Sequence, residues 1–185
     1  MNAFEDIVKL YLEEKGYWVR QSVKVNKISK QDKLDIGLPS MPRPEIDLVA
    51  LNVKKNELLL VEVKSYLDSY GVYFEAVSDK NNKLAERYRL FTDDKFREIV
   101  TKRLREEYLE QGLIDKNTAV NYALAAGHIH FPEDELKIKD HFSKQEEKWI
   151  LFPPKDIKEK VKELAEKGWE DNPVTMTAKL ILKSK

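Results

Sequence analysis

The pattern of apolar and polar positions divides the chain into alternating helices and strands. Residues 2–15 carry apolar side chains at three- and four-residue spacing from Phe4 to Tyr11, which is typical of one face of a helix. Gly16 follows directly and is a common residue at a helix end. Residues 17–25 alternate loosely between apolar and polar positions, which predicts a strand.

Two apolar segments follow and predict a pair of adjacent strands. Residues 45–51 and 58–65 are apolar on both alternating faces, so we expect both strands to be buried in a central sheet. The polar stretch between them predicts a turn. Residues 26–43 are polar and predict a long loop, a length that is more typical of functional or mobile segments.

The second half of the chain predicts further helices and strands. We expect helices over 81–91 and 94–111, then a strand over 118–126 whose small side chains suit a crowded interior. Residues 68–77 are ambiguous and fit an extended segment, while residues 132–148 fit irregular or partly helical structure. The remaining expected elements are a strand over 149–152, a helix over 153–167 and an edge strand over 174–182.

This order of elements predicts an α/β fold. The order is helix, three strands, helix and strand, followed by a helix–strand tail, which fits a mixed central sheet flanked by helices. The length of 185 residues predicts a single domain. We place its core over about 2–127 and a C-terminal extension over about 128–185.

Three charged residues interrupt the two central apolar segments. Asp47, Glu62 and Lys64 occupy positions where a buried strand ordinarily carries apolar side chains. A buried carboxylate must be paired, protonated or bound to a metal. If the turn is symmetric about Lys54-Lys55, Asp47 faces Glu62 across the two strands, with Cβ atoms about 4.5–5.5 Å apart. Two carboxylates this close repel each other unless a cation lies between them.

The type of ligand favours a hard cation. The chain has no Cys, which excludes disulfides, zinc–thiolate sites and cysteine nucleophiles. Mg²⁺ or Mn²⁺ is therefore the expected cofactor, held by Asp47 and Glu62 with the carbonyl of Val63 as a further ligand. Lys64 lies on the same face, where it could act on a water at the metal or stabilise charge on a phosphate.

The two segments resemble a known nuclease superfamily. PEIDLVAL and LLLVEVKS are similar to the two halves of the PD-(D/E)XK motif. IDLVAL followed by VEVK looks most like the archaeal Holliday-junction resolvase and Mrr-type restriction branches. The resemblance covers about residues 2–65 by motif. It implies a restriction-endonuclease-like core in which Asp47 and Glu62 hold the metal and Lys64 assists catalysis.

The resemblance also implies a role for one residue on the first helix. The chain differs from the family pattern at one position of the motif. Several branches carry a catalytic Glu on the first helix, which corresponds to Glu5. The Pro-Asp pair of the family is Pro44-Glu45 in this chain, so that the expected metal ligand is Asp47.

The activity that the resemblance implies is metal-dependent hydrolysis of phosphodiester bonds in DNA, as an endodeoxyribonuclease. A homodimer is a further expectation, because junction and restriction enzymes of the superfamily are often dimers. Two alternatives remain open. The chain could be a catalytically silent DNA-binding or assembly module that retains the fold, or an unrelated α/β domain whose charges form a structural network.

The candidate site residues also have structural interpretations. Asp47 and Glu62 could form an ion-paired group with Lys64, and Glu5 could complete a capping box with Asn2 at the start of the first helix. Further ion-pair partners are Lys24 for the two carboxylates and Glu45 for Lys64, although Glu45 also fits a charge at the rim.

Basic residues supply candidate phosphate contacts. Net charge is zero, because 33 Lys and Arg balance 33 Asp and Glu, which argues for a small DNA footprint or one assembled across a dimer. The segment 81–89 is the first candidate and the lysine-rich loop the second. The candidate DNA-binding residues are Lys27, Lys30, Lys33, Lys83 and Arg87.

Two smaller features complete the candidates. Ser65 and Tyr66 follow the motif directly and could contact the substrate. His128 and His130 have the spacing of a metal-binding pair, but the sequence suggests no third ligand.

The chain shows no signal for a membrane. No apolar run approaches the roughly 20 residues of a transmembrane helix. The N-terminal segment predicts an amphipathic helix rather than a signal peptide. We therefore expect a cytoplasmic protein.

Overall fold

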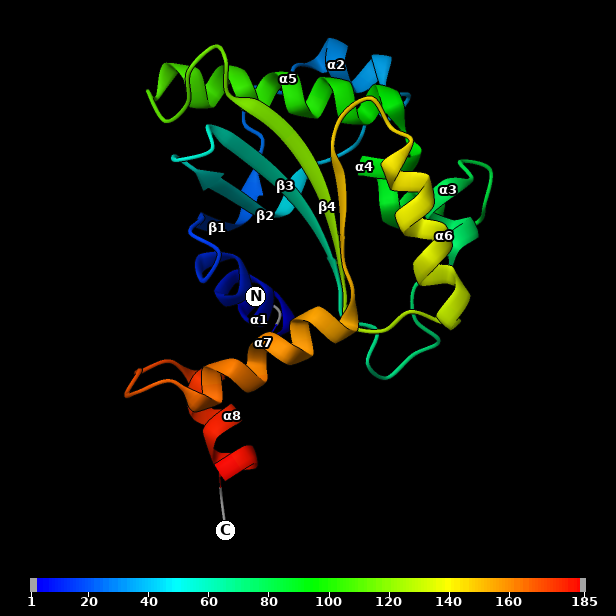
Figure 1. Cartoon of the computed structure of the whole chain (residues 1–185). Helices are drawn as coiled ribbons and strands as arrows, with labels where there is room; N and C mark the ends of the chain where they lie inside the picture. The colour runs from blue at the N-terminus through cyan, green and yellow to red at the C-terminus, as the bar shows by residue number, and fades with distance from the viewer. Residues whose placement is uncertain (1–2, 184–185) are drawn as a thin grey trace.

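The computed structural model describes residues 3–183 and contains a five-stranded mixed sheet flanked by helices (Figure 1). The strands follow each other across the sheet in sequence order. The first three are antiparallel, and the third, fourth and fifth are parallel. The α/β class with a mixed central sheet is therefore confirmed. The strands are β1 (Trp18–Lys24), β2 (Glu45–Asn52), β3 (Glu57–Lys64), β4 (Ala119–Ala126) and β5 (Trp149–Phe152).

Helices cover both faces of the sheet, and none within residues 3–183 is both long and apolar enough to cross a bilayer. The helices before β4 are α1 (Ala3–Glu13), α2 (Lys30–Asp35), α3 (Phe74–Ser78), the 3₁₀ helix η1 (Ala85–Tyr88), α4 (Arg89–Thr92) and α5 (Asp94–Glu110). The later helices are α6 (Pro132–Ser143), α7 (Pro154–Glu166) and α8 (Pro173–Lys183).

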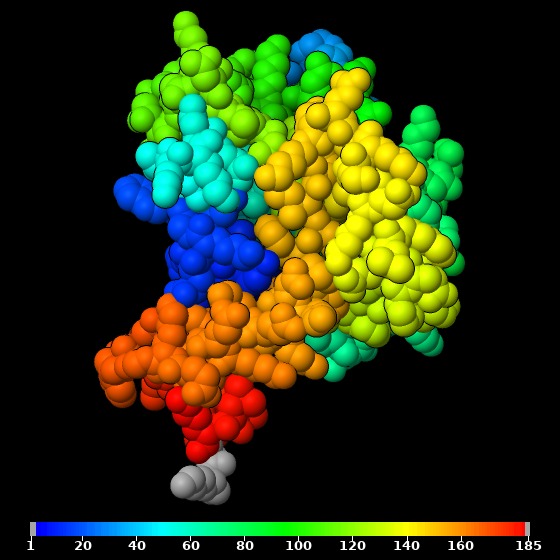
Figure 2. All heavy atoms as spheres, viewed as in Figure 1, coloured from blue at the N-terminus to red at the C-terminus, as the bar shows by residue number. Residues whose placement is uncertain are grey.

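Two apolar clusters separate the sheet from its helical layers. Leu58 and Leu60 of β3 belong to the cluster under α3 to α6, whereas Leu59 and Val61 belong to the cluster under α1 and α7. All four are at most 1% exposed, because a central strand carries apolar side chains on both faces. In the space-filling view α7 lies directly against α1, and α8 lies at the tip beyond it (Figure 2).

The predicted turn between the central strands has the expected symmetry. The ladder pairs Asn52 with Glu57 and continues to Leu48 opposite Val61, a register that is symmetric about Lys54-Lys55. The predicted register between the two central strands is therefore confirmed for the residues that the ladder pairs. Continuing the same register places Asp47 at the level of Glu62.

The predicted strand faces are wrong at one point. Ile46 belongs to the cluster on the α5 side, whereas Leu48 and Ala50 pack on the α1 side. The neighbouring strand changes side at the same level, since Val23 joins Ile46. Ser22 lies at this break with φ of 51°, a left-handed conformation that interrupts regular alternation.

The predicted C-terminal edge strand is wrong, because residues 173–183 form helix α8. Pro173 starts the helix, and the side chain of Asn172 accepts a hydrogen bond from the Thr175 N–H at 2.8 Å. Thr175 and Ala178 are buried, and α8 packs against α7. Cap chemistry and this packing override the β-rich composition of the segment.

Other segments that were expected to lack regular structure contain short helices. Ser29 and Asp32 form a capping box that starts α2 inside the expected loop. Residues 74–78 form α3 instead of an extended segment, and α6 occupies most of 132–148. Residues 81–91, expected as one helix, form a turn followed by η1 and α4. Strand β5 of the expected C-terminal extension pairs with β4 and so belongs to the sheet.

Candidate metal centre

Asp47, Glu62 and Lys64 come together at the carboxyl end of β3, where its pairing with β2 ends. The last paired residues are Leu48 and Val61. Beyond them, Asp47 Oδ2 accepts a hydrogen bond of 2.7 Å from the backbone N–H of Val63. The side chain of Asp47 therefore takes the place of the next backbone contact and is held beside Glu62 and Lys64.

The lysine forms an ion pair with the second carboxylate. Lys64 Nζ lies 2.5 Å from Glu62 Oε1, and the two side chains are 17% and 18% exposed. Both groups are thus withdrawn from bulk water but can still be reached from the surface. The site is a partly buried charged group at the sheet edge, as its position in the apolar strands predicted.

The burial of these groups shifts their pKa values. Burial raises the pKa of Asp47, while the hydrogen bond from Val63 and the charge of Lys64 oppose this shift. Burial also raises the pKa of Glu62, against the charge of Lys64, and nearby Asp47 adds to the increase. Burial alone lowers the pKa of Lys64, but the charge and hydrogen bond of Glu62, together with the charge of Asp47, outweigh burial and the net pKa is raised.

The donor set fits a hard divalent cation. Asp47 Oδ1 and Glu62 Oε2 accept no hydrogen bond within residues 3–183, so each carboxylate keeps one oxygen available. The Lys64 carbonyl accepts from Gly127 N on the β4 side, so the preceding Val63 carbonyl points to the β2 side, beyond the end of the ladder. Across residues 3–183 no three His, Asp or Glu side chains form a metal-binding group. Mg²⁺, which often takes only one or two carboxylates, suits this pair.

Two tyrosines adjoin the site. Lys64 Nζ lies 5.7 Å from the ring centroid of Tyr88, which is 2% exposed. Burial raises the pKa of Tyr88, and the charge and hydrogen bond of Tyr66 raise it further. Sequence reasoning suggested Tyr66 as a substrate contact but missed Tyr88. The apolar pattern of 81–91 could not have shown that η1 places this ring beside β3.

Glu5, which the resemblance assigns to the site, stays a prediction. Glu5 lies on α1 and is partly buried. Its alternative role in a capping box depends on Asn2, which lies outside the described residues.

Lys24 and Glu45, the alternative ion-pair partners of the site residues, pair with each other instead. Lys24 and Glu45 face each other across β1 and β2, with Lys24 Nζ 3.9 Å from Glu45 Oε2. Both side chains are about half exposed, at 54% and 44%. Glu45 is therefore a rim charge paired with Lys24, and Lys64 pairs with Glu62.

Two of the three lysines that were predicted to bind DNA from the loop form contacts within the protein. Lys27 forms an ion pair with Glu110, and Lys33 Nζ donates to the Met41 carbonyl at 2.5 Å. Lys30 is exposed and has no ion-pair partner among the described residues. These contacts leave Lys30 as the freest of the predicted loop cations.

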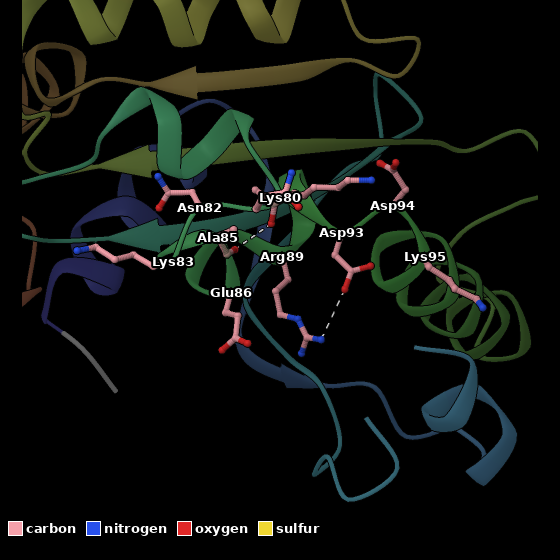
Figure 3. A pocket seen from close by; sticks show the side chains of 11 residues that line it. Lys80, Asn82, Lys83, Ala85, Glu86, Arg89, Asp93, Asp94 and Lys95 are labelled. Carbon is pink, nitrogen blue, oxygen red and sulfur yellow. Dashed lines mark hydrogen bonds and ion pairs between the residues drawn. The ribbon is translucent and has the colours of Figure 1, made fainter. Parts of the chain in front are cut away.

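The segment before α4 lines a surface hollow of about 570 Å³, which carries the acidic residues Glu86, Asp93 and Asp94 as well as basic ones (Figure 3). Lys80, Lys83 and Lys95 surround it and have no ion-pair partner within residues 3–183, whereas Arg89 pairs with Asp93 at 3.6 Å. Figure 3 shows the three ammonium groups pointing in different directions. Such a spread suits successive contacts along an extended polyanion better than capture of one small anion.

Arg87, the other predicted cation of this segment, is exposed and precedes Tyr88 in the chain. It has no ion-pair partner among the described residues, and its charge lowers the pKa of Tyr88 against the larger effect of burial. Tyr88 is the residue whose ring lies beside Lys64. Arg87 is thus a predicted DNA contact that acts electrostatically on a residue beside Lys64.

The two histidines organise a loop. His128 Nδ1 lies 3.0 Å from the Ser69 carbonyl, and His130 Nδ1 lies 2.7 Å from the Tyr70 carbonyl. Both rings therefore contact the backbone of the segment that follows β3. This geometry accounts for the pair without a metal.

Comparisons with known proteins identify no relative. A scan against protein-family models found no match, and neither the curated proteins nor the solved structures contain a match to this chain. Function must therefore be inferred from the site itself.

Proposed function

We propose that this protein is a metal-dependent endodeoxyribonuclease of the PD-(D/E)XK superfamily. The observation that carries the proposal is the meeting of Asp47, Glu62 and Lys64 at the carboxyl end of β3. An acid on one strand, followed by an acid and a lysine on the next, is the arrangement that the sequence resemblance implies. Ligands of α/β proteins commonly bind at the carboxyl ends of the strands.

The order of elements supports the same proposal. A helix precedes three antiparallel strands, and a helical segment then leads to a parallel fourth strand. This agrees with the restriction-endonuclease-like core that the resemblance implies. Strand β5 and helices α7 and α8 lie outside that core and extend it.

Each residue has a distinct role in the proposal. Asp47 and Glu62 hold Mg²⁺ or Mn²⁺ through their available oxygens, with the Val63 carbonyl as a further ligand. When bound, such a cation polarises the phosphate and lowers the pKa of a water. Lys64 stabilises the negative charge that develops on the phosphate, since its ammonium group lies beside both carboxylates.

The basic surface supports DNA as the substrate. Lys80, Lys83 and Lys95 line one hollow, and Arg87 is exposed beside Tyr88 in the chain. Exposed cations of this kind contact phosphates without reading sequence. DNA in preference to RNA rests on the family resemblance alone.

One observation favours a second candidate, a catalytically silent DNA-binding module. The ion pair between Lys64 and Glu62 already compensates one of the two buried carboxylates. A protein that had lost catalysis could retain this pair for stability alone. Metal binding separates the two candidates, because a silent module has no need for a cation at this site.

The test is a set of labelled DNA substrates, namely duplex, single strand, flap and junction, incubated with Mg²⁺ or Mn²⁺. We expect cleavage of at least one substrate by the native protein and none in EDTA. Glu62→Gln removes the ligand charge and abolishes cleavage. Glu75→Gln changes an exposed glutamate on α3 and leaves cleavage intact. Cleavage that persists in Glu62→Gln would contradict the proposal.

A further inference from the structure

Aromatic side chains gather on the surface next to the candidate metal centre. Tyr70 is 76% exposed and Phe131 is 48% exposed. The ring of His130 lies between them, with its centroid 4.0 Å from that of Phe131 and 6.0 Å from that of Tyr70. Tyr73 adds a fourth ring, 4.3 Å from His130 at an interplanar angle of 36°. We call these four residues the aromatic cluster.

The segment that carries Tyr70 is held firmly against the chain after β4. The Val72 N–H donates to the His128 carbonyl, and the His130 N–H donates to the Val72 carbonyl, both at 3.0 Å. The imidazoles of His128 and His130 contact the Ser69 and Tyr70 carbonyls. Backbone and side chains thus fix the loop from both sides, so Tyr70 is exposed on an ordered support.

Gly71 shows how closely the two segments approach each other. Its φ is 91°, and a Cβ at this position would lie 2.9 Å from the His130 backbone nitrogen. Only glycine meets both conditions. The exposed rings are therefore presented by a tightly built structure, which is the preorganisation expected of a binding surface.

The two segments that carry the aromatic cluster begin beside the candidate metal centre. The Gly127 N–H donates to the Lys64 carbonyl at 2.8 Å, immediately before the histidines. On the other segment, Tyr66 follows Lys64 by two residues and influences Tyr88, whose ring faces the Lys64 ammonium. Both segments that carry the aromatic cluster therefore start from the end of β3 where the candidate metal centre lies.

We propose that the aromatic cluster is a stacking platform for unpaired bases of the nucleic-acid substrate. The proposal rests on the proposed nuclease function and specifies its substrate class as DNA with single-stranded or unpaired nucleotides. Exposed Tyr, Phe and His rings bind bases by stacking, and this requires bases that are not already stacked in a duplex. A base stacked on Tyr70 or Phe131 leaves its phosphate free to enter the neighbouring site.

The test measures binding in EDTA, where a nuclease that requires metal does not cleave. The probe is a single-stranded oligonucleotide that contains 2-aminopurine, compared with a hairpin whose stem pairs the same base and whose loop is a linker without bases. We expect quenching of 2-aminopurine by the native protein with the single strand. Tyr70→Ala lowers the affinity for the single strand by roughly 10-fold, the range of one base–aromatic stack. Affinity for the hairpin stem is unchanged.

Tyr70→Phe is the matched control, because it keeps the ring and removes only the hydroxyl. It retains both affinity and quenching, and Phe131→Ala repeats the loss seen with Tyr70→Ala. Both residues are exposed, so the variants fold, and thermal melting checks this. If Tyr70→Ala binds both probes like the native protein, the platform is refuted and the rings are assigned to a protein partner. Equal losses for both probes also refute it.

Cleavage assays with Mg²⁺ on the same proteins separate this proposal from the proposed function. Absence of cleavage together with Tyr70-dependent stacking contradicts the nuclease and supports the platform. Cleavage together with unchanged binding by Tyr70→Ala supports the nuclease and contradicts the platform.

Discussion

The backbone N–H of Val63 donates a hydrogen bond to Asp47 Oδ2 at 2.7 Å, just beyond the last paired residues of β2 and β3. Val63 lies between Glu62 and Lys64, so this one contact fixes the acid of the first strand beside the two charged residues of the second. The geometry of the candidate site therefore follows from the end of a β-ladder.

The first prediction concerns Asp47→Asn. Burial raises the pKa of Asp47 above its value in the unfolded chain, so the ionised carboxylate destabilises the folded protein at neutral pH. Asparagine keeps an oxygen that can accept from Val63. We expect a higher melting temperature than the native protein in EDTA, and no increase when Mn²⁺ is added. If Mn²⁺ raised the melting temperature of both proteins equally, Asp47 would not be a metal ligand.

The second prediction concerns Lys64→Met, which keeps the length of the side chain but removes its charge. Cleavage falls by about 100-fold or more, the usual contribution of a positioned charged group in phosphate chemistry. Mn²⁺ still raises the melting temperature, because both carboxylates remain. Lys139→Met, on an exposed face of α6, leaves the cleavage rate unchanged. A Lys64→Met protein with native cleavage rates would contradict the proposed role.

The third prediction tests how α2 is held. Arg103 donates to Asp32 through Nε at 2.9 Å and Nη2 at 3.0 Å, and this pairing holds the pKa of Asp32 well below its usual range. Asp32→Asn lowers the free energy of unfolding by about 1–3 kcal/mol at neutral pH. A lowered pKa stabilises the fold above the unfolded pKa of about 4, so the difference from the native protein shrinks as the pH falls below that value.

The control for this measurement is Asp35→Asn on the same helix. Asp35 is exposed and accepts only from Gln31, so its replacement changes the free energy of unfolding little. Urea unfolding between pH 2 and pH 7 measures all three proteins. A constant difference between native and Asp32→Asn proteins over this range contradicts the ion-pair assignment.

The fourth prediction concerns the basic hollow. Replacing Lys80, Lys83 and Lys95 by Gln weakens DNA binding to all sequences alike, since these residues would contact phosphates. The slope of log K against log salt concentration is negative, and its magnitude becomes smaller by about 2–3 if each lysine neutralises one phosphate. Fluorescence anisotropy over a range of salt concentrations measures this slope. The control replaces three lysines that already pair with glutamate or aspartate within their own helices: Lys139, Lys144 and Lys155.

The fifth prediction compares Gly37→Ala with Gly71→Ala, to separate the cost of a positive φ from the cost of a steric clash. Gly37 and Gly71 both have positive φ, but an added Cβ meets nothing within 4 Å at Gly37 and meets the His130 backbone at Gly71. Gly37→Ala therefore costs about 1 kcal/mol of unfolding free energy, and Gly71→Ala costs more. Only Gly71→Ala also lowers affinity for single-stranded DNA. Equal losses of stability in the two variants would show that the loop tolerates displacement.

Much of the fold could be predicted because the signals were local. The alternation of residues 45–51 and 58–65 indicated two buried strands, and a symmetric turn between them determined their register. Strand geometry relates positions through a fixed period of two, so the sequence predicted that Glu62 and Lys64 share one face of β3, with Asp47 opposite Glu62.

The remaining features depend on contacts between distant parts of the chain. The left-handed Ser22 changes the face of two strands, and packing on α7 makes residues 173–183 helical despite their β-rich composition. The ring of Tyr88 beside Lys64 and the rings around His130 are likewise brought together by long-range packing. Local periodicity carries no information about such contacts. The sequence by itself therefore determined the two buried strands and the charged residues that interrupt them, while the tertiary structure decided the register of the strands and what surrounds those residues.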